Sequence, residues 1–216
     1  MKNHITTTVT TAVAAISAAA LAAPAHADSV TFEHSEFYEA GFPGGEFIAN
    51  LDSGSSYRSF CLEANEALTV GEGVVYDYLI NTEGAVSGGV SGGNPDPISS
   101  ATASVFMKWL TGVIENTAEN ATAVQFAIWA LEGEANPNNL DGTAESIYDE
   151  AVANFSTTDN AITDNAMFSK LRVLNPYLDV DGERVHYQSQ IILIPLPTAS
   201  GLALAGLAVI GTRRRR

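Results

Sequence analysis

Cysteine and basic residues are scarce in this chain of 216 residues. Its single cysteine, Cys61, excludes a disulfide framework and any metal site built from several cysteines. Ten basic residues stand against 25 acidic ones, for a formal net charge of −15. Residues 28–197 keep every acid but only five of the bases, so that segment carries −20. Such a surface repels phosphates, which excludes a nucleic-acid partner.

The first 27 residues have the composition of a secretory signal. Lys2 supplies the positive start, and residues 5–22 are uncharged and rich in Ala, Thr and Val. The small-residue sequence Ala-His-Ala at 25–27 is typical of a cleavage site. We therefore expect residues 1–27 to be a signal peptide and the mature chain to be exported into an oxidising compartment.

The other end combines a proline motif, an apolar stretch and a basic cluster. The apolar stretch at 199–210 is short for a membrane span, which needs roughly 20 residues. The arginines after it would stay on the cytoplasmic side. We expect a sorting signal at 194–216, carried by Pro195, Leu196, Pro197, Arg213, Arg214, Arg215 and Arg216.

This three-part tail resembles the sorting signal of PEP-CTERM exported proteins. It departs from the Pro-Glu-Pro form because Leu196 replaces the acid. The resemblance implies a precursor held in the inner membrane by a C-terminal helix and recognised by an exosortase-like sorting enzyme. The mature form would then lie at the cell surface or outside the cell. An ordinary tail anchor is the alternative.

Between the two ends, strand-like and helix-like segments follow one another. Alternating apolar residues and turn signals predict strands early and late in the segment, at 29–39, 44–51, 74–80, 171–174 and 186–194. Helical spacing appears after an expected N-cap at Asp96, again at 120–132, and after Asp141. The order predicts one α+β domain at 28–193, an antiparallel β-sandwich or barrel-like domain with a helical insertion.

Two local acidic patterns have plain structural interpretations. Glu132 and Glu134 fall at the expected end of the second helix, where the helix dipole disfavours acids, and a solvated helix end is the default interpretation. The sequence Asp-Val-Asp-Gly-Glu at 179–183 resembles half a calcium loop. A hairpin turn is the favoured interpretation of that segment.

Cys61 and Gln125 lie in two short motifs of matching character. Cys61 stands in Phe-Cys-Leu near the end of an expected strand, and Gln125 stands in Val-Gln-Phe-Ala-Ile-Trp near the start of an expected helix. Together they resemble the paired motif of bacterial thioester domains. In that family the cysteine attacks the glutamine amide, ammonia leaves, and the resulting thioester is opened by a surface amine. The resemblance implies that Cys61 and Gln125 form such a pair.

This chemistry needs these residue types. A thiolate is the required nucleophile, and a carboxamide provides an acyl group with a neutral leaving group. Apolar neighbours must exclude water, and the expected shielding residues are Phe60, Leu62, Ile128 and Trp129. Glu63 and Glu66 are both candidates for proton transfer.

The sequence therefore predicts a non-enzymatic cell-surface or extracellular-matrix protein. Its partner would be a surface amine or a polysaccharide or protein matrix, with no cofactor, metal or catalytic residue. One alternative is a structural matrix protein of the same fold, in which Cys61 is an inert buried thiol. A remote alternative is a cysteine hydrolase that pairs Cys61 with His34 or His186.

Overall fold

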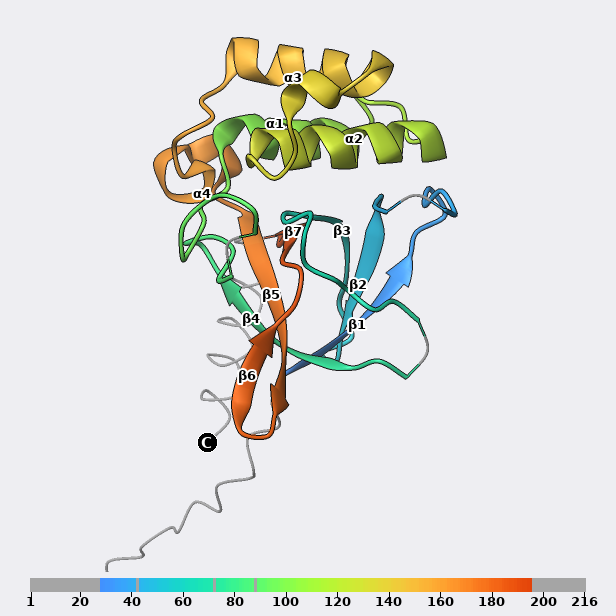
Figure 1. Cartoon of the computed structure of the whole chain (residues 1–216), viewed down its shortest axis with the longest axis vertical. Coiled ribbons are helices and arrows are strands. Elements are labelled where there is room, and N and C mark those ends of the chain that lie inside the picture. Colours follow the sequence, from blue (N-terminus) through green and yellow to red (C-terminus); the bar gives the residue numbers. More distant parts are fainter. Residues whose placement is uncertain (1–27, 42, 72, 88, 196–216) are drawn as a thin grey trace, which may run out of the picture.

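The strands of this chain pair edge to edge until the sheet closes on itself. The computed structural model describes residues 28–41, 43–71, 73–87 and 89–195, and the sheet order in these residues is β4-β1-β2-β3-β7-β5-β6. Because β4 also pairs with β5, six strands form a closed antiparallel barrel (Figure 1). The strands are β1 (Ser29–His34), β2 (Phe47–Leu51), β3 (Ser56–Cys61), β4 (Tyr76–Asn81), β5 (Leu171–Val180), β6 (Glu183–His186) and β7 (Gln190–Leu193).

Between β4 and β5 the chain leaves the barrel and forms a helical layer. Helices α1 and α2 face one end of the barrel, and α3 lies on their far side (Figure 1). The elements of this layer are α1 (Ser100–Leu110), α2 (Ala118–Leu131), η1 (Pro137–Asn139), α3 (Gly142–Asn154), α4 (Ala161–Asp164) and η2 (Ala166–Phe168). The α+β class and the helical insertion are confirmed, and the sheet is a barrel and not a sandwich.

Two apolar clusters hold these layers together. The barrel core fills the inside of the barrel with Val30, Phe32, Ala49, Leu51, Tyr76, Leu174 and Ile192. A second, larger helix–barrel core lies between the helices and the outer face of the strands, and includes Phe60, Leu62, Trp109, Ile128 and Ile191. Strand β7 contributes Ile191 to one cluster and Ile192 to the other, so it is buried on both faces.

The start of the helical layer differs from the sequence-based expectation. The N-cap of α1 is Ser99, whose side chain accepts a hydrogen bond from the N–H of Thr102. The expected cap, Asp96, is wrong because its backbone pairs with Ala85 in an isolated bridge, with both N–O distances 2.8 Å. This pairing keeps residue 96 extended, so the helix begins later.

The acidic pattern at 179–183 forms the turn between β5 and β6. Asp181 and Gly182 both have positive φ, at 52° and 87°, which suits the two central positions of a tight hairpin turn. The predicted hairpin is therefore confirmed.

The expected signal peptide at 1–27 and most of the sorting tail, residues 196–216, lie outside the described residues. Pro195 is described and exposed. Within the described ranges, no helix combines the length and the apolar character that a membrane span requires. The predicted apolar segment at 199–210 is not among those ranges.

Candidate functional site

Cys61 is the last residue of β3 and is 1 % exposed. Neighbouring residues of a strand point to opposite faces, so Phe60 enters the helix–barrel core while the thiol faces the other way. There it packs with Phe47 and Trp129 in a small cluster, here called the cysteine cluster. The cysteine is thus separated from solvent by aromatic side chains on its own side of the strand.

Gln125 reaches the cysteine from the buried face of α2. Its Nε2 donates to the backbone carbonyl of Cys61 at 2.8 Å, and its Oε1 accepts from the backbone N–H of Cys61 at 3.0 Å. The glutamine is 1 % exposed. The two residues that the thioester resemblance pairs are therefore in direct contact, and the side-chain amide is held in one orientation.

Gln190 is a third member of the site that the sequence analysis missed. It lies opposite Cys61 in the pairing of β3 with β7, and its Nε2 is 3.1 Å from the Cys61 Sγ. The hydroxyl of Ser59 donates to the Gln190 Oε1 at 3.1 Å, which turns the amide nitrogen toward the sulfur. A glutamine inside an apolar strand segment was a signal that this residue has a special role. The sequence pattern of one strand does not reveal which strand pairs with it, so Gln190 could not be placed beside Cys61.

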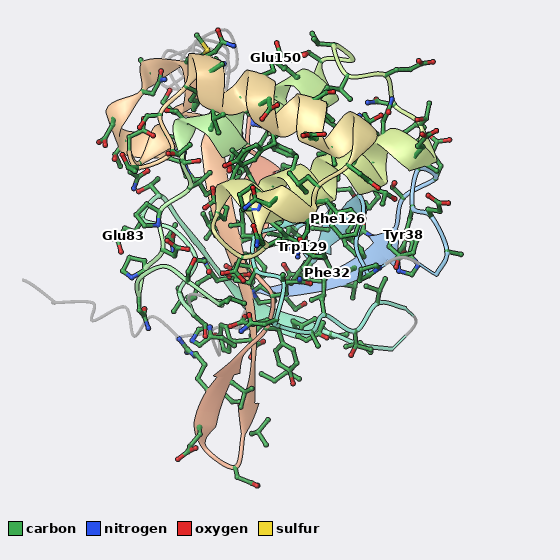
Figure 2. The ribbon with its side chains drawn as sticks, turned by 45° about the horizontal axis from the view of Figure 1, so that its top comes forward. Phe32, Tyr38, Glu83, Phe126, Trp129 and Glu150 are labelled. Carbon is green, nitrogen blue, oxygen red and sulfur yellow. The ribbon has the colours of Figure 1, made fainter. Side chains whose placement is uncertain are left out.

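The four predicted shielding residues are all buried, but they lie in different places. Trp129 belongs to the cysteine cluster and extends from α2 toward the barrel (Figure 2). The other three, Phe60, Leu62 and Ile128, belong to the helix–barrel core on the opposite face of β3. They support the strand and helix that carry the pair, whereas Trp129 covers the cysteine side.

The backbone of Gly44 packs against Gln125 and Trp129, a contact that the sequence did not indicate. A Cβ placed on Gly44 would lie 2.6 Å from the Gln125 Cγ and 2.8 Å from the Trp129 Cη2. The backbone at residue 44 therefore approaches the glutamine as closely as only a glycine allows.

The electrostatic setting keeps the cysteine protonated. Burial raises the pKa of the Cys61 thiol well above its usual range, and the charge of Glu63 adds to that rise. The hydrogen bond from Gln190 opposes both effects only in part. Since a thiol is a poor nucleophile, the site needs a group that takes the proton.

Glu63 is placed to exchange a proton at neutral pH. Burial raises its pKa to about 8, and the neighbouring charge of Glu66 contributes. One carboxylate oxygen accepts from the N–H of Ser189 at 2.6 Å, and the other, Oε1, is buried and has no hydrogen-bond partner among the described residues. Of the two candidates for proton transfer, Glu63 is the one electrostatically coupled to the thiol.

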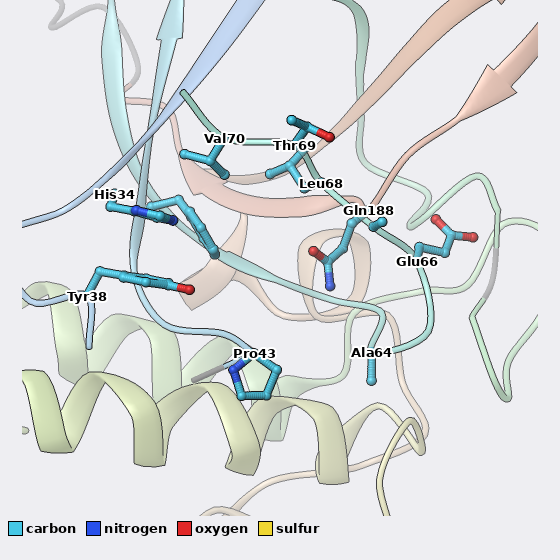
Figure 3. A pocket seen from close by; sticks show the side chains of 11 residues that line it. His34, Tyr38, Pro43, Ala64, Glu66, Leu68, Thr69, Val70 and Gln188 are labelled. Carbon is cyan, nitrogen blue, oxygen red and sulfur yellow. The ribbon is translucent and has the colours of Figure 1, made fainter. Parts of the chain in front are cut away.

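A cavity of about 490 Å³ lies beside the cysteine cluster (Figure 3). Glu66 lines it, so the second candidate acid has a different position from Glu63. The complete lining is His34, Tyr38, Pro43, Phe47, Ala64, Glu66, Ala67, Leu68, Thr69, Val70 and Gln188.

The acids after α2 are not a solvated helix end, which corrects the expectation for Glu132 and Glu134. The carboxylate of Glu134 accepts backbone N–H groups of Ala64 at 3.0 Å, Val90 at 2.7 Å and Ser91 at 3.1 Å. Glu132 accepts from the N–H of Ser99 at the N-terminus of α1, where the helix dipole favours a carboxylate. Both acids therefore connect separate segments of the backbone.

Neither histidine forms a hydrogen bond with the Cys61 Sγ among the described residues. The His34 ring stacks on Tyr38 with the ring centroids 3.7 Å apart, and His186 lies at the end of β6 beside Tyr177. The group that donates to the sulfur is the amide of Gln190, whereas a cysteine–histidine dyad has an imidazole there.

Comparisons with protein-family models, with curated proteins and with solved structures found no match.

Proposed function

We propose that this protein is a covalent surface anchor in which Cys61 and Gln125 join as an internal thioester. The observation that carries the proposal is the pair of hydrogen bonds that fixes the Gln125 carboxamide on the backbone of Cys61, in a site closed to solvent. Fixing a nucleophile and its acceptor in one orientation removes much of the entropic cost of their reaction.

Formation of the thioester proceeds by acyl transfer. The Glu63 carboxylate takes the thiol proton of Cys61, and the Gln190 amide donates to the sulfur anion that results. The sulfur attacks the Gln125 Cδ, a C–S bond forms and the C–N bond breaks. The nitrogen leaves as ammonia with the proton that Glu63 returns, so the reaction releases one ammonia and needs no cofactor.

Opening of the thioester attaches the protein to its target. The nitrogen of a primary amine attacks the Gln125 Cδ, an amide bond forms, and Cys61 recovers its proton as the C–S bond breaks. The acyl group is consumed in this step, so each chain reacts once and the protein is not an enzyme. The target amine would belong to the extracellular matrix or a neighbouring surface. Export, inner-membrane retention and exosortase-type sorting of the precursor are part of the proposal, supported by the sequence of the two ends.

The alternative of a structural matrix protein has one observation in its favour. The thiol is buried and protonated, as an inert core cysteine would be. The two functions differ in whether the chain takes up amines. The wild-type chain should bind one equivalent of biotin-cadaverine covalently, while Cys61→Ala and Gln125→Ala should bind none. Glu33→Gln, an exposed change on β1, serves as the matched control and should label normally. Labelling that persists in Gln125→Ala, or is absent from the wild type, contradicts the anchor.

A further inference from the structure

The cavity shown in Figure 3 adjoins the cysteine cluster without containing the Cys–Gln pair. Its volume of about 490 Å³ lies within the roughly 300–1,000 Å³ that is typical of small-molecule sites. Phe47 lines the cavity and belongs to the cysteine cluster, and Ala64 and Val70 line it and pack against that cluster. A molecule in this cavity would therefore lie against side chains that enclose Cys61.

Three aromatic rings in mutual contact form one wall of the cavity. The ring centroids of His34 and Tyr38 are 3.7 Å apart, and the Phe47 ring lies 5.6 Å from the first and 5.5 Å from the second. Leu68 and Val70 add aliphatic surface. Because the three rings support one another, this aromatic wall is preformed and offers apolar contact to a ligand.

Gln188 projects into the cavity from the side opposite the aromatic wall (Figure 3). The residue is 6 % exposed, and its Nε2 donates to the backbone carbonyl of Glu63, which fixes the orientation of the amide. Among the described residues, no hydrogen bond ends at the Gln188 Oε1. Since buried polar groups are normally paired, an acceptor held toward a cavity without a donor indicates a ligand that supplies one.

The described lining presents no charge to a ligand. The Glu66 carboxylate is turned away from the aromatic wall and is hydrogen-bonded with Ser87 (Figure 3). Partial desolvation lowers the pKa of His34, so the imidazole is neutral at pH 7. The segment 28–197 carries a formal charge of −20, which repels anions. These walls therefore favour an uncharged ligand that combines an apolar face with a hydrogen-bond donor.

The backbone groups at the cavity are already paired, which disfavours a peptide. His34 and Phe47 are partners in the pairing of β1 with β2. The hydroxyl of Tyr76 accepts from the N–H of Thr69 at 3.0 Å and donates to its carbonyl at 3.3 Å. An extended peptide is recognised through main-chain hydrogen bonds that such groups can no longer make. A sugar ring instead offers a face of C–H groups to aromatic side chains and a rim of hydroxyls to amides.

We infer that this cavity binds a neutral saccharide unit, with a sugar hydroxyl donating to the Gln188 Oε1 and the C–H face of the ring packed on the aromatic wall. The site does not depend on the thioester and goes beyond the proposed function. A polysaccharide bound here would hold the chain on the matrix with the reactive pair close to the polymer.

Binding is measured by NMR on the full-length chain with short oligosaccharides of matched length. The neutral probes are cellotriose, maltotriose and triacetylchitotriose, and trigalacturonate is the anionic control. At least one neutral probe should shift the backbone signals of Ala64, Ala67 and Leu68 in a saturable manner. Trigalacturonate and the neutral peptide N-acetyl-trialanine amide should shift none of them.

A variant of the acceptor tests the contact itself. Gln188→Met keeps the length of the side chain but removes the acceptor, and it should weaken binding of the responding probe about fivefold or more. Asn139→Met removes an exposed amide outside the cavity and should leave the affinity within about twofold. If Gln188→Met does not fold, the shifts measured on the unmodified chain still decide between a site and none.

Three results would overturn the inference. The first is the absence of a saturable shift with every neutral probe, or shifts confined to residues outside the lining. The second is binding of trigalacturonate or of the peptide as tight as that of the best sugar, because the cavity then does not select a neutral saccharide. The third is equal affinity in folded Gln188→Met and in the wild type, because the sugar then makes no contact with the acceptor.

Discussion

The side-chain amide of Gln125 makes the two hydrogen bonds to the Cys61 backbone that a neighbouring β-strand would make. Its Nε2 donates to the Cys61 carbonyl at 2.8 Å, and its Oε1 accepts from the Cys61 N–H at 3.0 Å. This contact joins helix α2 to the end of strand β3. It places a carboxamide against a cysteine whose thiol is protonated and closed to water.

Gln190 should act as a positioning residue for the sulfur. Gln190→Leu removes the only polar group that donates to the Cys61 Sγ within the described part of the chain. The sulfur anion then loses its donor, and thioester formation should slow about tenfold or more. The rate of ammonia release after refolding measures this effect. A structural role alone would lower the unfolding midpoint without changing that rate in the folded chain.

Gly44 should tolerate no side chain. In Gly44→Ala the new Cβ meets the Gln125 Cγ at 2.6 Å, so the glutamine must move and stability should fall by about 1–3 kcal/mol. The thioester yield should fall with it. Gly45→Ala is the comparison: its Cβ would meet the Tyr38 ring at 3.2 Å, which a shift of a few tenths of an ångström relieves, so its loss of stability should be smaller. If both variants form the thioester equally well, the close approach at residue 44 does not position Gln125.

Glu63 should make the stability of the chain depend on pH. Its pKa in the folded state, about 8, lies above the value of 4.5 for a solvated glutamate. Below about pH 4.5 the protonated carboxyl contributes its full stabilisation, which is lost as the pH rises through about 8. Glu63→Gln imitates the protonated form, so its advantage over the wild type should grow between about pH 5 and about pH 9.

Urea unfolding of both chains at the two pH values measures this difference. Glu132, whose pKa is raised to about 7, makes the free energy of unfolding of both chains depend on pH in the same way, so its contribution cancels in the comparison. A difference that is constant with pH would show that Glu63 titrates normally.

Glu134 should hold the segments next to the cysteine cluster. Glu134→Ala leaves the N–H groups of Ala64, Val90 and Ser91 without their acceptor, and should cost about 2–5 kcal/mol. Thioester opening by methylamine should become faster, because Ala64 packs against the cysteine cluster. The exposed change Glu119→Ala on α2 should alter neither quantity. Equal unfolding midpoints for the two variants would contradict the assigned role of Glu134.

The fold was predictable where local signals are strong and independent of partners. The hairpin at 179–183 follows from its turn residues and the helix after Asp141 from its helical spacing, and both are confirmed. The single strand expected at 186–194 is wrong in its bounds, because β6 ends at His186 and β7 spans only Gln190–Leu193. Strand β7 is buried on both faces, so alternation does not define its ends. Closure of the barrel depends on the pairing of β4 with β5, which no local pattern encodes.

The candidate site was predictable only in part for a related reason. Cys61 and Gln125 stand in recognisable motifs, whereas Gln190, Gly44 and Glu134 act through contacts with distant segments. A buried glutamine, a glycine in a loop and an acid after a helix are each common in isolation. Their roles appear only when the pairing of β3 with β7 and the position of α2 are known.

The most direct measurement is the intact mass of the full-length chain, purified without reducing agents or primary amines. The thioester predicts a mass lower by one ammonia, a single methylamine incorporated on treatment, and one thiol freed in the same step. Cys61→Ala and Gln125→Ala should show neither the deficit nor the uptake. A wild-type mass equal to the sum of its residues, with a free thiol and no methylamine uptake, would contradict the thioester and leave a structural protein in which Gln125 only supports the strand that carries Cys61.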